Sequence, residues 1–286
     1  MAANTAALRG ITKQYKDFTL GPVDMTVPAG SIVGLIGENG AGKTTLLKIL
    51  CGVNRADDGT VDLLGGSPAD AATRAKIGVV FEDAFFYGSF TAAQVGRSMA
   101  GVYGARWRDE AFAAYLRRFG LDAGKKLKEY SRGMRLKLSL AAALAHDPEL
   151  LVLDEATAGL DPVVRGELMD LFLEFIQDER HSIIMSSHIT ADLEQVADSI
   201  AYLHNGQLLF HENKDELLQS YGVLHCGEDV LTSLPAGLVV FTRRGAYGCE
   251  SLVRERRTVQ ELLPEAVCDA ARLDDIMRFY SGRDAQ

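Results

Sequence analysis

The sequence predicts an α/β fold, with one large domain followed by a modest C-terminal appendage. Its 286 residues exceed the usual size of a single domain, and 47% hydrophobic with 24% charged residues is typical of a chain that buries a sizeable core. Short apolar runs typical of buried strands alternate with helical patterns along most of the chain. A glycine-rich turn joins the first such run, residues 31–36, to a helical pattern over Lys43–Leu50.

Four short apolar runs are predicted as strands of one sheet, and a hairpin is predicted to close it. The runs are residues 31–36, 77–81, 150–153 and 182–186. Asn205 and Gly206 then provide the strongest short-range hairpin signal. Residues 200–203 and 207–210 are therefore expected to pair, giving the sheet its edge.

The remaining segments are predicted as a helical subdomain and a tail. Residues 92–145 carry helical patterns with little β-branched content. Nearer the C-terminus, glycines and prolines separate short strand-like runs, and helices are predicted at residues 259–262 and 273–280. We therefore expect a main domain over residues 1–222 and a small α+β domain over residues 223–286.

Composition and charge argue against several classes of protein. The net charge of −9 disfavours nucleic-acid binding, because affinity for phosphate backbones comes from clustered Lys and Arg. The longest apolar runs fall far short of the roughly 20 residues that cross a bilayer, and the first residues lack a signal-peptide pattern. We therefore expect a cytoplasmic protein. Its four cysteines lie too far apart for a Cys-x-x-Cys motif, so we expect reduced thiols. They are Cys51, Cys226, Cys249 and Cys268.

The loop between the first strand and the first helix fits the P-loop pattern G-x-x-x-x-G-K-[ST] in full. Its residues are Gly37, Glu38, Asn39, Gly40, Ala41, Gly42, Lys43 and Thr44, with Thr45 following. Backbone N–H groups of such a loop surround phosphate oxygens, and the helix directs its positive dipole end at the anion. Lys43 is expected to reach the β- and γ-phosphates, and the Thr44 hydroxyl to bind Mg²⁺. A chance glycine-rich turn is the alternative. The motif alone does not choose among nucleotide-binding families.

Two adjacent carboxylates follow the third predicted strand. Asp154 and Glu155 are expected at its carboxyl end, the edge where α/β sheets bind ligands. Asp154 is suited to hold the Mg²⁺ shell, and Glu155 to polarise the water that attacks the γ-phosphate. A strand-end acid pair that caps the next helix is the alternative.

Four motifs in a fixed order resemble those of the ABC ATPase family. They are the signature-like Tyr130-Ser131-Arg132-Gly133-Met134, the Asp154-Glu155 pair, the D-loop-like Ala158-Gly159-Leu160-Asp161, and Ser186-Ser187-His188. The resemblance covers about the first 220 residues. It implies a P-loop NTPase fold of ABC type with a β-rich edge. The signature variant is similar to that of bacterial exporters of peptides and antimicrobial compounds, whose membrane subunits are separate chains.

The resemblance also implies cofactors, partners and residue roles. ATP and Mg²⁺ are the cofactors, and the partners are an integral membrane subunit and a second ATPase subunit, either a copy of this chain or a close paralogue. In the family the signature residues contact ATP held by the opposite subunit, which here implies Ser131, Arg132, Gly133 and Met134. His188 takes the switch role and Tyr15 the adenine-stacking role, although a structural histidine and an ordinary strand tyrosine are the alternatives. Asp161 belongs to the D-loop.

The sequence departs from the family pattern at two positions. Glu82 stands where the family has Gln, and it is expected to serve as a metal ligand with a steeper Mg²⁺ dependence. Arg132 stands where the signature has Gly, either as a cation near phosphate or as a surface arginine. Phe85, Phe86 and Tyr87 follow in a predicted loop, where they either receive a helix of the membrane subunit or pack in the core.

Two other functions compete with a transporter ATPase. Soluble ABC proteins that act on ribosomes or DNA commonly carry a second cassette or a long coiled-coil insertion, and this chain shows neither. A P-loop kinase or a non-hydrolysing regulator is disfavoured by the signature and by Glu155.

Overall fold

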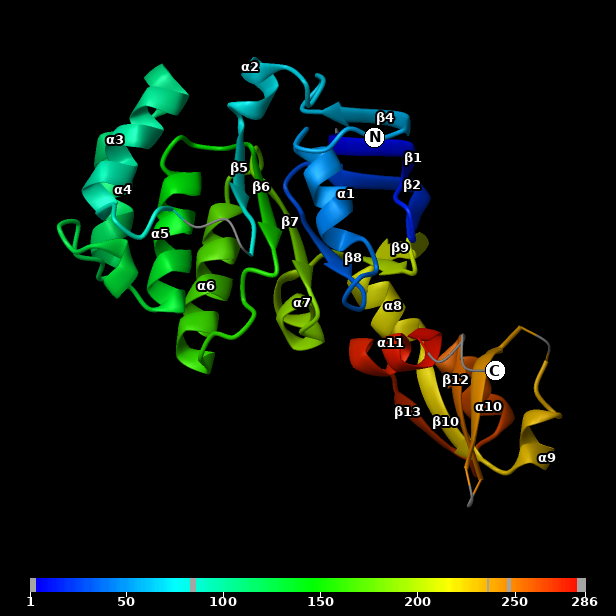
Figure 1. Ribbon diagram of the computed structural model, residues 1–286. Helices are drawn as coiled ribbons and strands as arrows, with labels where there is room; N and C mark the ends of the chain where they lie inside the picture. The colour runs from blue at the N-terminus through cyan, green and yellow to red at the C-terminus, as the bar shows by residue number, and fades with distance from the viewer. Residues whose placement is uncertain (1–3, 83–85, 236, 246–247, 282–286) are drawn as a thin grey trace. The chain divides into compact units, whose positions relative to one another are not determined.

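The computed structural model describes residues 4–82, 86–235, 237–245 and 248–281, and its chain forms two compact units. One unit comprises residues 1–197 and 201–211, and the other comprises residues 198–200 and 212–286. Figure 1 shows the elements of each. Among the described helices, none combines the length and the hydropathy needed to span a membrane.

A six-stranded sheet forms the centre of the larger unit, in the order β5-β6-β7-β3-β8-β9. These strands are β3 (Ile32–Ile36), β5 (Ile77–Val80), β6 (Leu150–Asp154), β7 (Ser182–Ser187), β8 (Ser199–His204) and β9 (Gln207–Asn213). β3, β6 and β7 are buried along their whole length, as expected for parallel strands covered on both faces. The predicted hairpin is present, and its turn residues Asn205 and Gly206 both have positive φ angles.

A second, antiparallel sheet forms the β-rich edge. Its order is β2-β1-β4, with β1 (Asn4–Gln14), β2 (Thr19–Pro28) and β4 (Asp58–Leu63). Side chains of this sheet share one core with β3 and with α1 (Lys43–Leu50), which begins and ends as the sequence predicted. Three further helices complete the region: α2 (Ala71–Arg74), α6 (Pro162–Phe175) and α7 (Thr190–Val196). The shared core fixes α1, and with it the P-loop, against the parallel sheet.

The helical subdomain occupies the segment where the sequence predicted it. It consists of α3 (Ala92–Tyr103), α4 (Asp109–Arg118) and α5 (Arg132–Leu144), with single 3-10 turns at 104–106 and 127–129. Thr91 and Gln94 form a capping box that starts α3. The helices pack around their own apolar cluster, which includes Trp107, Phe112 and Leu138. Figure 1 shows this subdomain at the opposite end of the larger unit from β1, β2 and β4.

The smaller unit is an α+β structure with its own core. Its antiparallel sheet has the order β11-β12-β10-β13, built from β10 (Gly222–Cys226), β11 (Val239–Gly245), β12 (Gly248–Val253) and β13 (Val267–Ala270). Its helices are α8 (Lys214–Ser220), α9 (Glu228–Leu231), α10 (Arg256–Leu262) and α11 (Leu273–Ser281). α10 and α11 contain the two helices predicted from the sequence. The predicted domain limits, 1–222 and 223–286, stay a prediction.

Candidate nucleotide-binding and catalytic site

The P-loop joins β3 to α1 and borders a cavity of about 380 Å³. Gly40 and Gly42 have φ angles of +84° and +107°, a backbone conformation that favours glycine. A Cβ on Gly37 would lie 2.2 Å from the carbonyl oxygen of Leu203, so the loop passes too close to β8 for any side chain there. The cavity lies at the N-terminus of α1 and is also lined by Tyr15, Phe18, Glu38, Asn39, Thr45, Glu82 and Glu155. This backbone geometry suits the phosphate cradle predicted from the sequence, and phosphate binding there stays a prediction.

Lys43 is the first residue of α1 and is buried, with 6% of its surface exposed. Its Nζ donates to the carbonyl oxygens of Gly37 at 2.7 Å and Glu38 at 3.2 Å. The same nitrogen forms an ion pair with Glu155 Oε1 at 3.2 Å. Lys43 therefore stands between the loop and Glu155, where phosphate oxygens would compete for its hydrogen bonds.

Asp154 ends β6 and is held by two hydroxyl groups. Thr44 Oγ1 donates to Asp154 Oδ2 at 2.8 Å, and Ser186 Oγ donates to Asp154 Oδ1 at 2.7 Å. The carboxylate is only 2% exposed. A carboxylate next to a hydroxyl is the oxygen-rich environment that Mg²⁺ prefers, with substrate phosphates supplying further ligands. Within the described residues, no group of three or more His, Cys, Asp or Glu side chains could hold a metal. A shared metal and phosphate site fits these residues.

The charge of Asp154 also affects a nearby cysteine. Cys51 follows α1 and is buried. Burial, and then the negative charge of Asp154, raise the pKa of Cys51 to about 12. Its thiol therefore stays protonated at neutral pH, as suits a reduced, buried cysteine.

Glu155 occupies a strained backbone position, with a φ angle of +51°. Its N–H donates to Ser186 Oγ at 3.0 Å, and its carboxylate receives the ring Nδ1 of His188 at 2.7 Å and the His188 backbone N–H at 3.3 Å. The other carboxylate oxygen, Oε1, is buried and has no hydrogen-bond donor among the described residues. Glu155 is thus oriented by His188 and Ser186. Its Oε1 pairs with Lys43 and becomes available to accept a proton from water when phosphate oxygens draw Lys43 away.

An aromatic wall borders the loop on the side of the antiparallel sheet. Tyr15 is 46% exposed, and its ring centroid lies 6.4 Å from that of Phe18. Both residues line the cavity with the P-loop. An exposed aromatic face beside a phosphate cradle is suited to stacking on a nucleotide base, the role predicted for Tyr15.

The signature-like segment forms the N-terminus of α5. Ser131 is the N-cap, and its Oγ accepts a hydrogen bond from Met134 N at 3.2 Å. Gly133 faces Leu160, whose nearest methyl lies 3.6 Å from where a Cβ would stand. Ser131 is exposed at this positive helix terminus, which is an arrangement suited to meeting an anion from outside the subunit.

The two departures from the family pattern contact each other. Arg132 Nη2 lies 3.1 Å from Glu82 Oε1, and the side chains are 52% and 44% exposed. Arg132 is therefore a partly exposed residue whose side chain points toward Glu82. It is an ion-pair partner of the residue at the expected metal-ligand position.

The remaining predicted residues have assigned places. Asp161 is the N-cap of α6, where Oδ1 accepts from Val163 N and Val164 N at 3.1 and 3.0 Å. Phe86 packs on the core of the helical subdomain, whereas Tyr87 is 76% exposed. Phe85 lies outside the described residues.

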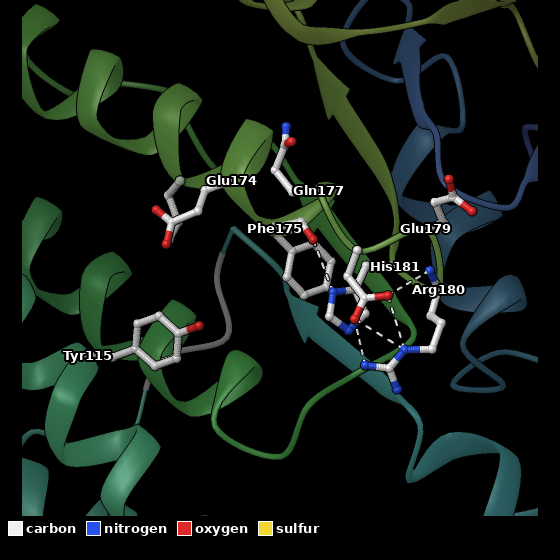
Figure 2. Close-up of a pocket in the computed structure, with 9 residues that line it drawn as sticks. Tyr115, Glu174, Phe175, Gln177, Glu179, Arg180 and His181 are labelled. Carbon is white, nitrogen blue, oxygen red and sulfur yellow. Dashed lines mark hydrogen bonds and ion pairs between the residues drawn. The ribbon is translucent and has the colours of Figure 1, made fainter.

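A larger cavity of about 840 Å³ lies at the opposite edge of the sheet (Figure 2). It adjoins the segment before β7, at the amino end of that strand, whereas nucleotide sites lie at carboxyl ends. Figure 2 shows the rings of Phe175 and His181 face to face, with centroids 4.3 Å apart, and Tyr115 on the opposite wall. Asp178 and Arg180 form an ion pair there, so these two charges neutralise each other. We assign the chemistry to the smaller P-loop cavity.

Ser186 belongs to the Ser186-Ser187-His188 motif, but sequence reasoning assigned a role only to His188. The structure shows that Ser186 bonds both Asp154 and Glu155. Its position follows from the sheet register, because Ser186 pairs with Asp154 across β6 and β7. A hydroxyl near the end of the strand next to the acid pair is the signal that could have identified it.

The parallel sheet, the P-loop, the held Asp154 and the oriented Glu155 define a P-loop nucleoside triphosphatase. A family model described as ABC transporter matches residues 20–158. The bacitracin transport ATP-binding protein BcrA of Enterococcus faecalis is 35% identical over 72% of this chain and 68% of its own length. The lantibiotic transport ATP-binding protein SrtF of Streptococcus pyogenes is 33% identical over 73% of this chain and 90% of its own. The chain belongs to the family of ABC transporter ATP-binding proteins.

Another relative belongs to the same family, and two solved structures share the fold. An uncharacterized ABC transporter ATP-binding protein of Synechocystis is 38% identical over 73% of this chain, which spans 60% of that relative's length. The structure of an ATP-binding subunit of an ABC transporter has a TM-score of 0.67 and 28% identity, covering 74% of this chain and 91% of that one. A dimeric ATP-binding cassette bound to ADP and phosphate, at 23% identity and a TM-score of 0.66, shares the fold over 73% of this chain and 98% of its own.

Proposed function

We propose that this chain is the ATP-binding and ATP-hydrolysing subunit of an ABC transporter, working as one half of a dimer that encloses two ATP molecules. The observation that carries the proposal is the arrangement around Glu155. Its carboxylate is fixed by His188 at 2.7 Å and lies 3.2 Å from the P-loop lysine, Lys43. A base held next to a phosphate cradle is what in-line attack of water on a γ-phosphate requires.

Residues in the same cavity supply the other parts of the reaction. Thr44, Asp154 and Glu82 would hold Mg²⁺, which neutralises developing charge on the phosphates when it is bound. Tyr15 would stack on adenine. Asp154 keeps its orientation through Ser186, so hydrolysis needs little reorganisation of the protein at that carboxylate.

The second subunit would complete the site. Ser131 and the N-terminus of α5 offer a hydroxyl and a positive helix end to an anion from outside the subunit. Two copies arranged head to tail would each present this terminus to the triphosphate on the other's P-loop. Loss of the γ-phosphate would remove charge-assisted contacts across the interface and allow the dimer to open.

The transport partner is an integral membrane subunit, and we propose that the chain lies in the cytoplasm on the inner face of the membrane. The names of the relatives support export of peptides or drug-like compounds, because BcrA and SrtF are named for bacitracin and lantibiotic transport. Action on ribosomes or DNA is the weaker alternative, since the chain carries a net charge of −9.

ATP hydrolysis by the purified chain tests the enzymatic part of the proposal. Lys43→Ala is expected to remove nucleotide binding and turnover, because it deletes the buried cation of the cradle. Lys76→Ala is the matched control. Lys76 Nζ lies 3.6 Å from Glu149 Oε1, and neither residue lines the cavity. Turnover that survives in Lys43→Ala would refute the enzymatic assignment.

Association with a membrane subunit tests the transport part. Purification of the tagged chain from detergent-solubilised native membranes is expected to recover an integral membrane protein. Tyr87→Glu should reduce that recovery while ATP hydrolysis persists, because Tyr87 is 76% exposed and does not line the nucleotide cavity. Full recovery with Tyr87→Glu would exclude this aromatic residue from the docking surface.

A further inference from the structure

We propose that Arg132 is the counter-ion that allows a carboxylate, Glu82, to stand in the nucleotide cavity of its own subunit. Arg132 is a positioning residue that controls how strongly Glu82 repels the triphosphate. The inference rests on the proposed function, since it takes ATP as the ligand of the P-loop cavity.

Glu82 lines two adjoining cavities. One is the P-loop cavity, which it shares with Lys43 and Thr44. The other is a narrow space lined also by Arg132, Asp154 and Glu155. Three carboxylates therefore surround the place where a triphosphate would bind, and like charges at such short range repel. Each carboxylate needs a partner if an anion is to bind beside it.

The described contacts assign a different partner to each carboxylate. Asp154 receives two hydroxyl hydrogen bonds, and Glu155 has His188 and the ammonium group of Lys43. Glu82 has the Arg132 guanidinium, 3.1 Å away. Lys43 is already shared among Glu155 and two loop carbonyls, so Arg132 supplies the cation for Glu82.

The Arg132 side chain passes close to the turn at Gly159 on its way to Glu82. Arg132 is the first residue of α5, directly after the Ser131 cap. Its guanidinium lies over Gly159, where a Cβ would stand 3.4 Å from Nη1 and 3.6 Å from Cζ. Gly159 also has a φ angle of +70°, so this turn leaves room for a flat guanidinium. The pair thereby joins the signature segment, the D-loop and the Glu82 position within one subunit.

The pair does not have the properties of a stabilising contact. Both side chains are about half exposed, and ion pairs of this kind contribute little to the stability of a fold. A carboxylate beside a polyanionic ligand has a larger effect on binding, because every phosphate charge interacts with it. The consequence of the pair should therefore appear in nucleotide affinity and not in unfolding.

The test is a double-mutant cycle on nucleotide binding without metal. A fluorescent ATP analogue is titrated into the full-length chain in EDTA, for wild type, Arg132→Gln, Glu82→Gln and the double variant. Arg132→Gln is expected to raise Kd by about five-fold, the upper range for an exposed pair. In the Glu82→Gln background the same change should alter Kd by less than about two-fold. Arg132→Lys, which keeps the charge, should stay near wild type.

The matched control is another exposed pair between the helical subdomain and α6. Arg118 and Glu174 lie 2.6 Å apart with 41% and 62% exposure, and neither residue lines the P-loop cavity. Arg118→Gln and Glu174→Gln are expected to leave Kd unchanged. Thermal unfolding should be shifted no more by the Arg132 and Glu82 variants than by these controls.

Two results would overturn the inference. An equal loss of affinity from Arg132→Gln in both backgrounds would mean that Arg132 contacts phosphate directly. No loss of affinity from Arg132→Gln when Glu82 is present would mean that Glu82 needs no counter-ion. Failure of the proposed function would give a different result. Wild type itself would then fail to bind the analogue, or would bind it no more tightly than Lys43→Ala does.

Discussion

At the scale of single residues, Ser186 connects the two carboxylates on which the chemistry depends. Its Oγ donates to Asp154 and accepts the backbone N–H of Glu155. That N–H belongs to a residue with a positive φ angle, a conformation that persists only where surrounding contacts hold it. One hydroxyl therefore orients the metal-site carboxylate and helps to keep the catalytic base in its strained position.

Replacing Ser186 should impair catalysis without unfolding the protein. Ser186→Ala is expected to lower ATP turnover by about ten-fold and to raise the Mg²⁺ concentration needed, since losing a side chain that hydrogen-bonds a metal ligand typically has an effect of this size. Steady-state hydrolysis measured across a Mg²⁺ titration checks this. Ser182→Ala is the control, because Ser182 lies at the other end of β7 and bonds Thr5. A Mg²⁺ profile identical to that of wild type would contradict the account.

At the scale of elements, the sequence predicted the parts that carry local signals. The strands β3, β6 and β7 are short apolar runs, and α1 and the hairpin turn are marked by glycines. The antiparallel sheet was not predicted from any single strand. β1 has register irregularities around Gly10, which interrupt the period-two pattern that would identify it.

Contacts between distant segments could not be predicted from local pattern. Arg132 and Glu82 are 50 residues apart, and their contact depends on how the helical subdomain packs on the parallel sheet. Sequence reasoning found both departures and treated them as separate questions. The structure joins them in one ion pair.

A buried histidine of the helical subdomain should make the stability of the protein depend on pH. His146 follows α5, stacks on Tyr103 with ring centroids 3.8 Å apart, and its Nε2 donates to the Ile77 carbonyl at 3.1 Å. Burial, together with the charge of Arg106, lowers the pKa of His146 below its ordinary value of 6.5. The unfolded chain therefore binds a proton more readily, so the free energy of unfolding falls as pH drops through that ordinary value.

Thermal unfolding at two pH values checks this prediction. Between about pH 7.5 and about pH 5.5, Tm of wild type should fall further than Tm of His146→Gln, which lacks the titrating group. Other titrating groups are common to both proteins, so the difference isolates His146. Parallel declines in the two proteins would show that His146 does not contribute.

At the scale of the whole molecule, the larger unit presents two helix N-termini with different surroundings. The N-terminus of α1 lies in the P-loop cavity with Lys43 and Thr44. The N-terminus of α5 carries the exposed Ser131 and does not line that cavity. A positive helix end without a phosphate partner in its own subunit is readily explained if the partner is the nucleotide of a second subunit.

Dimerisation driven by ATP tests this account most directly. Glu155→Gln removes the base but keeps the shape of the site, so turnover should fall about 10²-fold or more and bound ATP should persist. With ATP, light scattering coupled to size-exclusion chromatography should report a dimer of Glu155→Gln and a monomer of Glu155→Gln combined with Lys43→Ala. A Glu155→Gln protein that stays monomeric at saturating ATP, or that dimerises equally without nucleotide, would contradict the account.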